Sequence, residues 1–246
     1  MTSPKTTRIN KYLSEVGFCS RRAADKLIAQ GRVTINGKVP EMGTKIVAND
    51  EVRVDGKLIS PPKEKPVYLA FNKPVGIVCT TDTKREKNNI IDYIGYHKRI
   101  FPIGRLDQMS EGLILLTNDG DIVNKILRSR NNHEKEYLVT VNRPITPKFL
   151  QKMRNGVPIL GTVTRKCTVK QVGEFQFRIV LSQGLNRQIR RMCDHLGYHV
   201  KRLVRERIMH LRLDMPVGVC RELRPDELRK LQQSIKHSRK THDGDQ

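Results

Sequence analysis

The sequence predicts an α+β protein. A small N-terminal module of helices and hairpins is joined to a larger domain with a mixed, mainly antiparallel sheet flanked by helices. Two helical patterns and two hairpin-turn signals crowd into the first 60 residues, a proline-rich stretch "SPPKEKPV" follows, and longer apolar runs fill the remainder. We therefore expect domains at residues 1–60 and 67–232, a linker at 61–66, and a polar, frayed tail at 233–246.

The N-terminal module is predicted to open with two short helices. Residues 9–16 carry apolar side chains at i, i+3, i+4 and i+7, which is one face of a helix, and Gly17 ends the pattern. A second helix is expected to begin at an N-cap on Ser20 and to stop at Gly31. Its buried face would be formed by Ala23, Ala24, Leu27 and Ile28.

Two turn signals follow these helices. Val33, Ile35 and Val39 alternate around Asn36-Gly37, and "DEVRVDGKLI" repeats the pattern around an Asp-Gly pair. Such pairs are favoured in two-residue hairpin turns because both central residues need a positive φ angle. The module is therefore predicted to be two helices packed on small hairpins.

Apolar runs predict the strands of the larger domain. Four of them are "VYLAFNKP", "GLILLTN", "EYLVTVN" and "FQFRIVLSQ". Continuous apolar runs are typical of strands covered on both faces. Helical patterns separate them near residues 122–128, 146–155 and 186–196, and Asn186 is the expected cap of the last helix.

The charge of the chain indicates its partner. Lys and Arg number 47 against 25 Asp and Glu, a formal net charge of +22. A protein this basic repels itself unless a polyanion is near, so nucleic acid is the leading partner. A membrane surface would need a lysine-rich amphipathic helix, and no apolar stretch approaches the roughly 20 residues of a spanning helix.

The remaining composition favours a cytoplasmic, metal-free protein. The start, "MTSPKTTRINKYLSE", lacks the apolar core of a secretory signal, so we expect the chain to stay in the cytoplasm. Its five cysteines are scattered singly and without zinc-ligand spacing. We therefore expect reduced, buried thiols and no metal site.

Several arginines are predicted at helix N-termini, where the helix dipole disfavours cations. Arg21 and Arg22 begin the second helix, and Arg187, Arg190 and Arg191 lie in the first turns of the last one. Cations in such positions call for anionic partners, and an RNA phosphate or a buried carboxylate would serve. For Arg21 and Arg22, solvated side chains are the alternative.

One carboxylate is conspicuous in this basic chain. Asp107 follows Gly104 and Arg105 and precedes the apolar run at 113–116. A carboxylate held by an arginine stays ionised, as a nucleophile or general base must. Asp107 is therefore the candidate catalytic group, with a purely structural turn aspartate as the alternative.

Longer motifs carry a family resemblance. "RINKYLSEVGFCSRRAADKLIAQGRVTINGKV" resembles an S4 domain, a small RNA-binding module. From residue 66 onwards the chain resembles a pseudouridine synthase of the RsuA-like group, which commonly joins an S4 domain to the catalytic domain. The signatures, in the expected order, are "FNKPVGIVCTT", "GRLDQMSEGLILLTNDGD", "KEYLV" and "GLNRQIRRM". Four ordered motifs are more specific than any one of them.

The resemblance implies a role for each matching residue. Asp107 would act on the target uridine so that the base detaches, rotates and rejoins through C5. Tyr137 would pack on the base and take part in proton removal. Arg190 would pair with the aspartate, although Arg187 or Arg191 stays open as that partner. The residues expected to contact RNA are Arg105, Arg187, Arg191, Arg21, Arg22 and Lys73.

The implied reaction needs no cofactor, because it exchanges one bond to C1′ for another without net redox change. Whether the carboxylate attacks C1′ or deprotonates C2′ is left open. The expected substrate is structured RNA with an extruded uridine. A stem-loop of 23S ribosomal RNA is favoured, with 16S ribosomal RNA or a tRNA anticodon loop as alternatives. We expect a monomer, and the competing class is a non-catalytic RNA-binding or ribosome-assembly factor.

Overall fold

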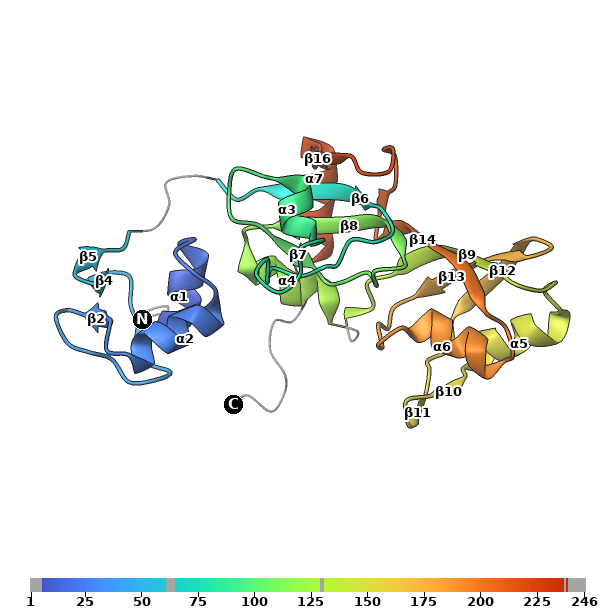
Figure 1. Ribbon diagram of the computed structural model, residues 1–246, viewed down its shortest axis with the longest axis horizontal. Coiled ribbons are helices and arrows are strands. Elements are labelled where there is room, and N and C mark those ends of the chain that lie inside the picture. The colour runs from blue at the N-terminus through green and yellow to red at the C-terminus, as the bar shows by residue number, and fades with distance from the viewer. Residues whose placement is uncertain (1–5, 61–64, 129–130, 237, 239–246) are drawn as a thin grey trace. The chain divides into compact units, whose positions relative to one another are not determined.

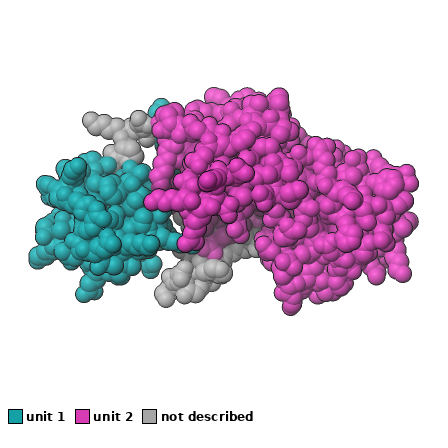
Figure 2. Space-filling view, viewed as in Figure 1, with its two compact units in different colours: residues 1–66, 118–120 teal, residues 67–117, 121–246 magenta. Residues whose placement is uncertain are grey.

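The structure is a computed structural model that describes residues 6–60, 65–128, 131–236 and 238. The chain divides into two compact units, one of residues 1–66 with 118–120 and the other of residues 67–117 with 121–246 (Figure 2). The predicted linker falls largely on 61–64, and most of the predicted tail on 237 and 239–246. Both segments lie outside the described residues.

Two helices and short strands build the smaller unit. The helices are α1 (Ile9–Glu15) and α2 (Arg21–Ala29), and the strands are β1 (Thr7–Arg8), β2 (Val33–Ile35), β3 (Lys45–Ile46), β4 (Val52–Val54) and β5 (Lys57–Leu58). As predicted, the Ser20 side chain caps α2 by accepting from the Ala23 amide. Ile9, Leu13 and Ile28 lie in the core with the valines of β2 and β4.

The predicted hairpins are confirmed only in part. Asp55 and Gly56 both have positive φ angles and join β4 to β5. The turn at Asn36 leads only to an isolated bridge between Ile35 and Lys38, because β2 pairs with β4 instead. Val39, expected to alternate into the core, is 60% exposed.

The larger unit is built on the predicted mixed sheet (Figure 1). Its strands run in the order β12-β13-β9-β14-β8-β6-β16, with β7 paired to β8 and β15 to β14. Only the β14–β8 pair is parallel among these described strands. Their bounds are β6 (Tyr68–Lys73), β7 (Phe101–Ile103), β8 (Glu111–Thr117), β9 (Lys135–Val141), β12 (Thr168–Gly173), β13 (Gln176–Leu181), β14 (Val200–Ile208), β15 (Leu211–Arg212) and β16 (Cys220–Glu222).

Helices cover both ends of this sheet. α5 and α6 lie by the end that holds β12, β13 and β9, whereas α3, α4 and α7 lie by β6 and β8 (Figure 1). A small hairpin of β10 (Pro158–Ile159) and β11 (Thr162–Val163) follows α5. The helices are α3 (Ile90–Ile94), α4 (Gly120–Leu127), α5 (Pro147–Asn155), α6 (Gln188–His195) and α7 (Pro225–Ser234).

Strand β8 is buried on both faces, as its continuous apolar run predicts. Its side chains alternate between two cores. Leu113 and Leu115 pack with residues of α4 and α7, whereas Ile114 and Leu116 pack with Ile90 of α3. The loop that precedes β8 is therefore joined to a strand whose residues are all buried.

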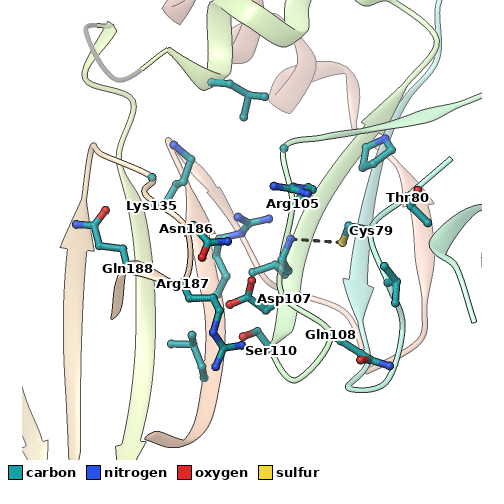
Figure 3. Close-up of a pocket in the computed structure, with 18 of the residues that line it drawn as sticks. Cys79, Thr80, Arg105, Asp107, Gln108, Ser110, Lys135, Asn186, Arg187 and Gln188 are labelled. Atoms are coloured by element: carbon teal, nitrogen blue, oxygen red, sulfur yellow. Dashed lines mark hydrogen bonds between the residues drawn. The ribbon is translucent and has the colours of Figure 1, made fainter. Parts of the chain in front are cut away.

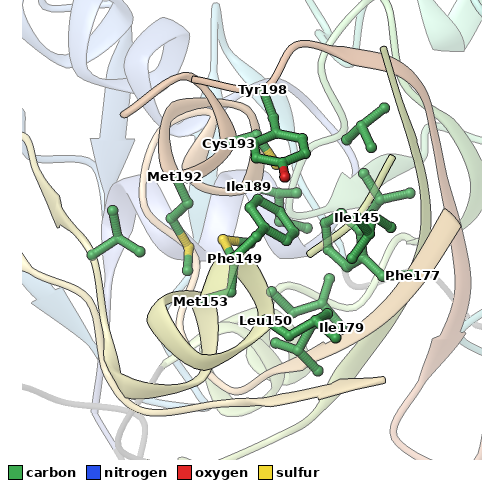
Figure 4. Packing of buried hydrophobic residues seen from close by; sticks show 14 of the residues in the cluster. Ile145, Phe149, Leu150, Met153, Phe177, Ile179, Ile189, Met192, Cys193 and Tyr198 are labelled. Carbon is green, nitrogen blue, oxygen red and sulfur yellow. The ribbon is translucent and has the colours of Figure 1, made fainter. Parts of the chain in front are cut away.

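A third core fixes α6 against the far end of the sheet (Figure 4). The ring of Phe149 lies 5.4 Å from that of Phe177 and 4.1 Å from that of Tyr198, measured between centroids. Met192 and Cys193 of α6 are fully buried beside them. The helix predicted near residues 186–196 is thus confirmed, with its apolar side chains in this core.

Two elements depart from the sequence predictions. β14 was not among the strands expected from the sequence, yet it is the central strand. Helix α7 continues to Ser234, and Ile235 is buried in the core with Leu231. The tail therefore begins at least three residues later than predicted, because Ile235 has an apolar partner.

The five cysteines of the chain all lie in the described residues. All five cysteines are free thiols, two of them buried and three half-buried. In the described residues, no helix combines the length and apolar character needed to cross a membrane.

Candidate active site

Strand β14 brings the loop before β8 close to Tyr137 of β9. It lies between β9 and β8, and its Arg205 is in register with Tyr137 of β9 and Gly112 of β8. Gly112 has a φ angle of +106°, and a Cβ there would lie 2.5 Å from the carbonyl oxygen of Arg205. Only glycine allows the two backbones to approach this closely. The loop ahead of β8 and Tyr137 consequently line one pocket.

Two contacts anchor the loop at residues 104–110. Gly104 has a φ angle of +80°, and a Cβ there would lie 2.8 Å from the Leu127 side chain of α4. Leu106 is buried, and its amide donates to Cys79 Sγ at 3.4 Å. The buried leucine leaves the residues on either side of it at the pocket.

The loop then closes a turn at Asp107. The Ser110 amide donates to the Asp107 carbonyl at 2.9 Å, so the turn uses the backbone of the aspartate. The half-buried carboxylate has no hydrogen-bond or ion-pair partner among the described residues. It points toward the side of the pocket where Asn186 and Arg187 lie (Figure 3). A turn-capping role would have used these oxygens, so the geometry favours a functional carboxylate.

The pocket around Asp107 is large and basic. Its volume is ≈ 1150 Å³, above the roughly 300–1,000 Å³ of typical small-molecule sites. Five cationic side chains line it: Arg85, Arg105, Lys135, Arg187 and Arg205. Arg105 and Arg187 are exposed and therefore accessible to a ligand. Such a pocket suits an anionic polymer that inserts one residue.

Tyr137 forms part of the pocket wall. It is half-buried on β9 and packs against two of the hydrophobic cores. Its ring is therefore fixed in place while one side remains available in the pocket. A fixed aromatic ring suits stacking on a nucleobase.

Arg190 lies behind the turn. It is 9% exposed and donates to the Met109 carbonyl at 2.7 Å and to Ser110 Oγ at 3.3 Å. Burial and the nearby Arg187 lower its pKa, while the Asp107 charge raises it. The two side chains thus interact electrostatically, but they form no direct ion pair of the kind the resemblance implied. Arg190 instead holds the turn that presents Asp107.

The start of α6 differs from the prediction. Its N-cap is Arg187, in a left-handed conformation with φ 49°, and not Asn186. Asn186 instead accepts from Arg191, through its carbonyl and its side-chain oxygen, both at 3.1 Å. The left-handed residue turns the chain sharply and leaves Asn186 outside capping position. Arg191 is thereby held on the loop, whereas Arg187 is at the pocket.

Lys73 is not available for the predicted RNA contact. It is fully buried on β6 and donates to the Pro74 carbonyl at 2.7 Å and the Gln108 carbonyl at 3.4 Å. Burial lowers its pKa. Its ammonium group binds a carbonyl of the turn that follows Asp107, so the structure gives Lys73 a positioning role.

Two buried cations of the pocket were not predicted from the sequence. Lys135 and Arg205 line the pocket and are only 8% and 3% exposed. Lys135 is the first residue of the "KEYLV" motif, which drew attention only to its tyrosine. The position of Arg205 in the pocket could not be predicted, because β14 was not recognised as a strand.

The arginines of the smaller unit are on its surface. Arg21 and Arg22 are exposed in the first turn of α2, as predicted. No acidic side chain lies in that turn. They are therefore free to meet an anion.

The family follows from comparison with known proteins. The sequence profile for RNA pseudouridylate synthase matches residues 67–195, a segment that includes Asp107, Tyr137 and Arg190. The chain belongs to this family. The profile of the S4 domain matches residues 7–52 of the synthase.

Relatives and a solved structure agree with this assignment. The dual-specificity RNA pseudouridine synthase RluF of Salmonella typhi is 58% identical to this synthase, over 93% of this chain and 79% of the relative. The RluF protein of Escherichia coli strain K12 is 56% identical over 97% of this chain and 82% of its own. The ribosomal large subunit pseudouridine synthase B of Bacillus subtilis is 33% identical, over 94% and 98%. A crystal structure of a pseudouridylate synthase superposes with a TM-score of 0.67 at 29% identity, covering 91% of this chain and 99% of that one.

Proposed function

We propose that this synthase isomerises a specific uridine in a stem-loop of 23S ribosomal RNA, with Asp107 as the catalytic carboxylate and without a cofactor. The observation that carries the proposal is the free carboxylate of Asp107 in a basic pocket. A protein that only bound RNA would gain nothing from a negative charge at that position. The fixed turn beneath the carboxylate supports the same conclusion, because catalysis requires exact placement.

The proposed chemistry balances without any external group. The bond between C1′ and N1 breaks, the base rotates, and a bond between C1′ and C5 forms. The C5 proton is lost to a base, and N1 gains a proton from solvent. Attack of Asp107 on C1′ and deprotonation of C2′ are both routes that use this carboxylate.

Other side chains have supporting roles in this proposal. Tyr137 packs on the uracil ring and takes part in removing the C5 proton. Arg190 acts through the turn that it holds, by fixing Asp107 relative to the ribose. Arg105 and Arg187 bind the RNA around the extruded nucleotide. The pocket must admit a base taken out of its stack, which suits a loop uridine.

The names of the relatives support the choice of RNA. The Bacillus subtilis relative is a ribosomal large subunit enzyme, and the RluF proteins are described as dual-specificity. We therefore favour 23S ribosomal RNA and add a second RNA substrate, for which a tRNA anticodon loop is the candidate.

Tritium release tests the catalytic assignment. Ribosomal RNA labelled with [5-³H]uridine should release tritium with the intact protein, and Asp107→Asn should stop that release. Asp82→Asn is the matched control, because Asp82 also lines the pocket but is exposed and pairs with Arg85. Circular dichroism shows whether both variants fold. Normal release by a folded Asp107→Asn protein would refute the assignment.

Mapping tests the choice of RNA. Pseudouridines are located by carbodiimide treatment and primer extension, in cells with and without the gene. The proposal expects one 23S stem-loop position, together with one tRNA position, to disappear with the gene. A change confined to 16S ribosomal RNA would contradict the proposed substrate but not the reaction.

A further inference from the structure

Arg205 carries an unusual unmet hydrogen-bonding group. Its side chain is 3% exposed, and its Nε donates to the Leu113 carbonyl at 2.6 Å. Its Nη2 is buried and has no hydrogen-bond partner among the described residues. A buried charged donor without a partner is costly and rare, so it calls for an explanation. Because Arg205 also lines the pocket, a ligand is one source of that partner.

Lys135 is a second buried cation in the same wall. It is 8% exposed, and among the described residues its Nζ donates only to the His133 carbonyl, at 3.3 Å. Burial and the charge of Arg205 lower its pKa to about 8. The structure therefore places two buried, mutually repelling cations in the wall of one pocket.

The carboxylates nearest in sequence do not neutralise this pair. Glu136 and Glu134 both bind Arg207, at 2.7 and 3.0 Å, and Glu206 binds Arg178 at 3.0 Å. Successive side chains of a strand point to opposite faces, so Glu136 is directed away from the face of Lys135. The acids of these strands are thus already paired elsewhere.

We propose that Lys135 and Arg205 form a subsite for one backbone phosphate of the RNA, adjacent to the nucleotide that enters the pocket. The inference rests on the proposed function, since it takes RNA to be the pocket's occupant. A phosphodiester carries one negative charge and several acceptor oxygens, so it can satisfy Nη2 of Arg205 and the ammonium of Lys135 together. RNA supplies one such group for every nucleotide.

The uracil base is a poorer match to this pair. Its carbonyl oxygens could accept from Arg205, but the base is neutral and would leave two buried positive charges uncompensated. The pocket volume of ≈ 1150 Å³ also exceeds what a base alone would fill.

Inorganic phosphate is the first probe. The full chain is labelled with ¹³C at lysine Cε, and the Lys135 signal is assigned with Lys135→Arg. Phosphate, titrated against chloride at constant ionic strength, should move this signal and raise the pKa of Lys135 by about one unit. Lys152 of α5, which is exposed, serves as the internal control. The proposal is overturned if the Lys135 signal stays unchanged, or if Lys152 responds equally.

RNA binding is the second arm. A synthetic stem-loop that carries the mapped uridine receives neutral methylphosphonates one at a time. One of them, next to that uridine, should weaken binding to the wild-type protein by about 10- to 100-fold. The same substitution should cost nothing further in Lys135→Met, whereas Lys152→Met should behave as wild type. If every methylphosphonate weakens binding to Lys135→Met as much as it weakens binding to the wild type, Lys135 contacts no phosphate of the RNA. That result would refute the RNA contact and leave the subsite as one for free phosphate.

The two arms separate this proposal from the proposed function, because neither requires turnover. Tritium release by Asp107→Asn would refute the catalytic assignment and leave the phosphate response intact. A silent Lys135 signal would refute the subsite while Asp107 remained catalytic.

Discussion

Replacing Lys135 by methionine should stabilise the free protein. The pKa of this lysine falls from 10.5 to about 8, and each pH unit of displacement corresponds to about 1.36 kcal/mol. Keeping Lys135 charged in the folded state therefore costs about 3 kcal/mol relative to the unfolded chain at neutral pH. Loss of the weak bond to the His133 carbonyl offsets about 1 kcal/mol of this. A net gain of about 2 kcal/mol remains.

The stability difference between Lys135→Met and the wild type should depend on pH. Below about pH 8 the lysine is charged in both folded and unfolded states, so the wild type bears the full cost. As pH rises from about 8 to 10.5, only the unfolded lysine stays protonated, and the wild type gains stability relative to the variant. The advantage of Lys135→Met should therefore be largest near pH 7. Above the ordinary lysine pKa the missing bond to the His133 carbonyl should leave the variant less stable than the wild type by about 1 kcal/mol.

Thermal unfolding followed by circular dichroism measures the effect. A gain of about 2 kcal/mol corresponds to a rise of about 4–8 °C in the unfolding midpoint. Lys152→Met, at an exposed position of α5, should change stability by less than about 0.5 kcal/mol. A Lys135→Met protein that is less stable at pH 7, or whose advantage does not depend on pH, would refute the reasoning.

Three further predictions follow from the site. Gly112→Ala should destabilise the fold by about 3 kcal/mol, because the new Cβ meets the β14 backbone. Gly37→Ala, with a similar positive φ but open space around it, should cost only about 1 kcal/mol in urea unfolding. Equal costs would exclude the close-approach argument. Arg187→Gln should reduce the slope of log affinity against log salt by about 1, and Arg191→Gln should reduce it less, because Asn186 already holds Arg191. Identical slopes would contradict this distinction. Arg190→Met should lower kcat at least tenfold with little change in KM, because it releases the turn at Asp107. A raised KM with unchanged kcat would show that Arg190 binds RNA directly.

Local patterns were sufficient for much of the fold. The apolar run of β8 and the helical pattern near residues 186–196 indicated buried elements, because their apolar side chains face cores at fixed periods. β14 escaped prediction because register shifts at Val200–Arg202 and Arg205–Arg207 break its alternation, and charged residues occupy most of its sequence. Ile235 was assigned to a polar tail because its apolar partner, Leu231, lies within a helix that the sequence did not indicate.

The site shows the same division. Asp107 could be found from the sequence, because a carboxylate next to Gly104 and Arg105 in so basic a chain is a local anomaly. The role of Lys73 could not, since its complete burial depends on strands far apart in the chain. Membership of a sequence motif therefore does not tell whether a residue is exposed.

The sequence by itself determined the fold class, the basic character, and the order of the motifs that carry Asp107, Tyr137 and Arg190. Only the tertiary structure decided which cations reach the pocket. Lys135 and Arg205 become neighbours because β9 and β14 pair across some 70 residues of chain. Whether a cation is solvated, paired with an acid or left to meet a ligand depends on such long-range neighbours.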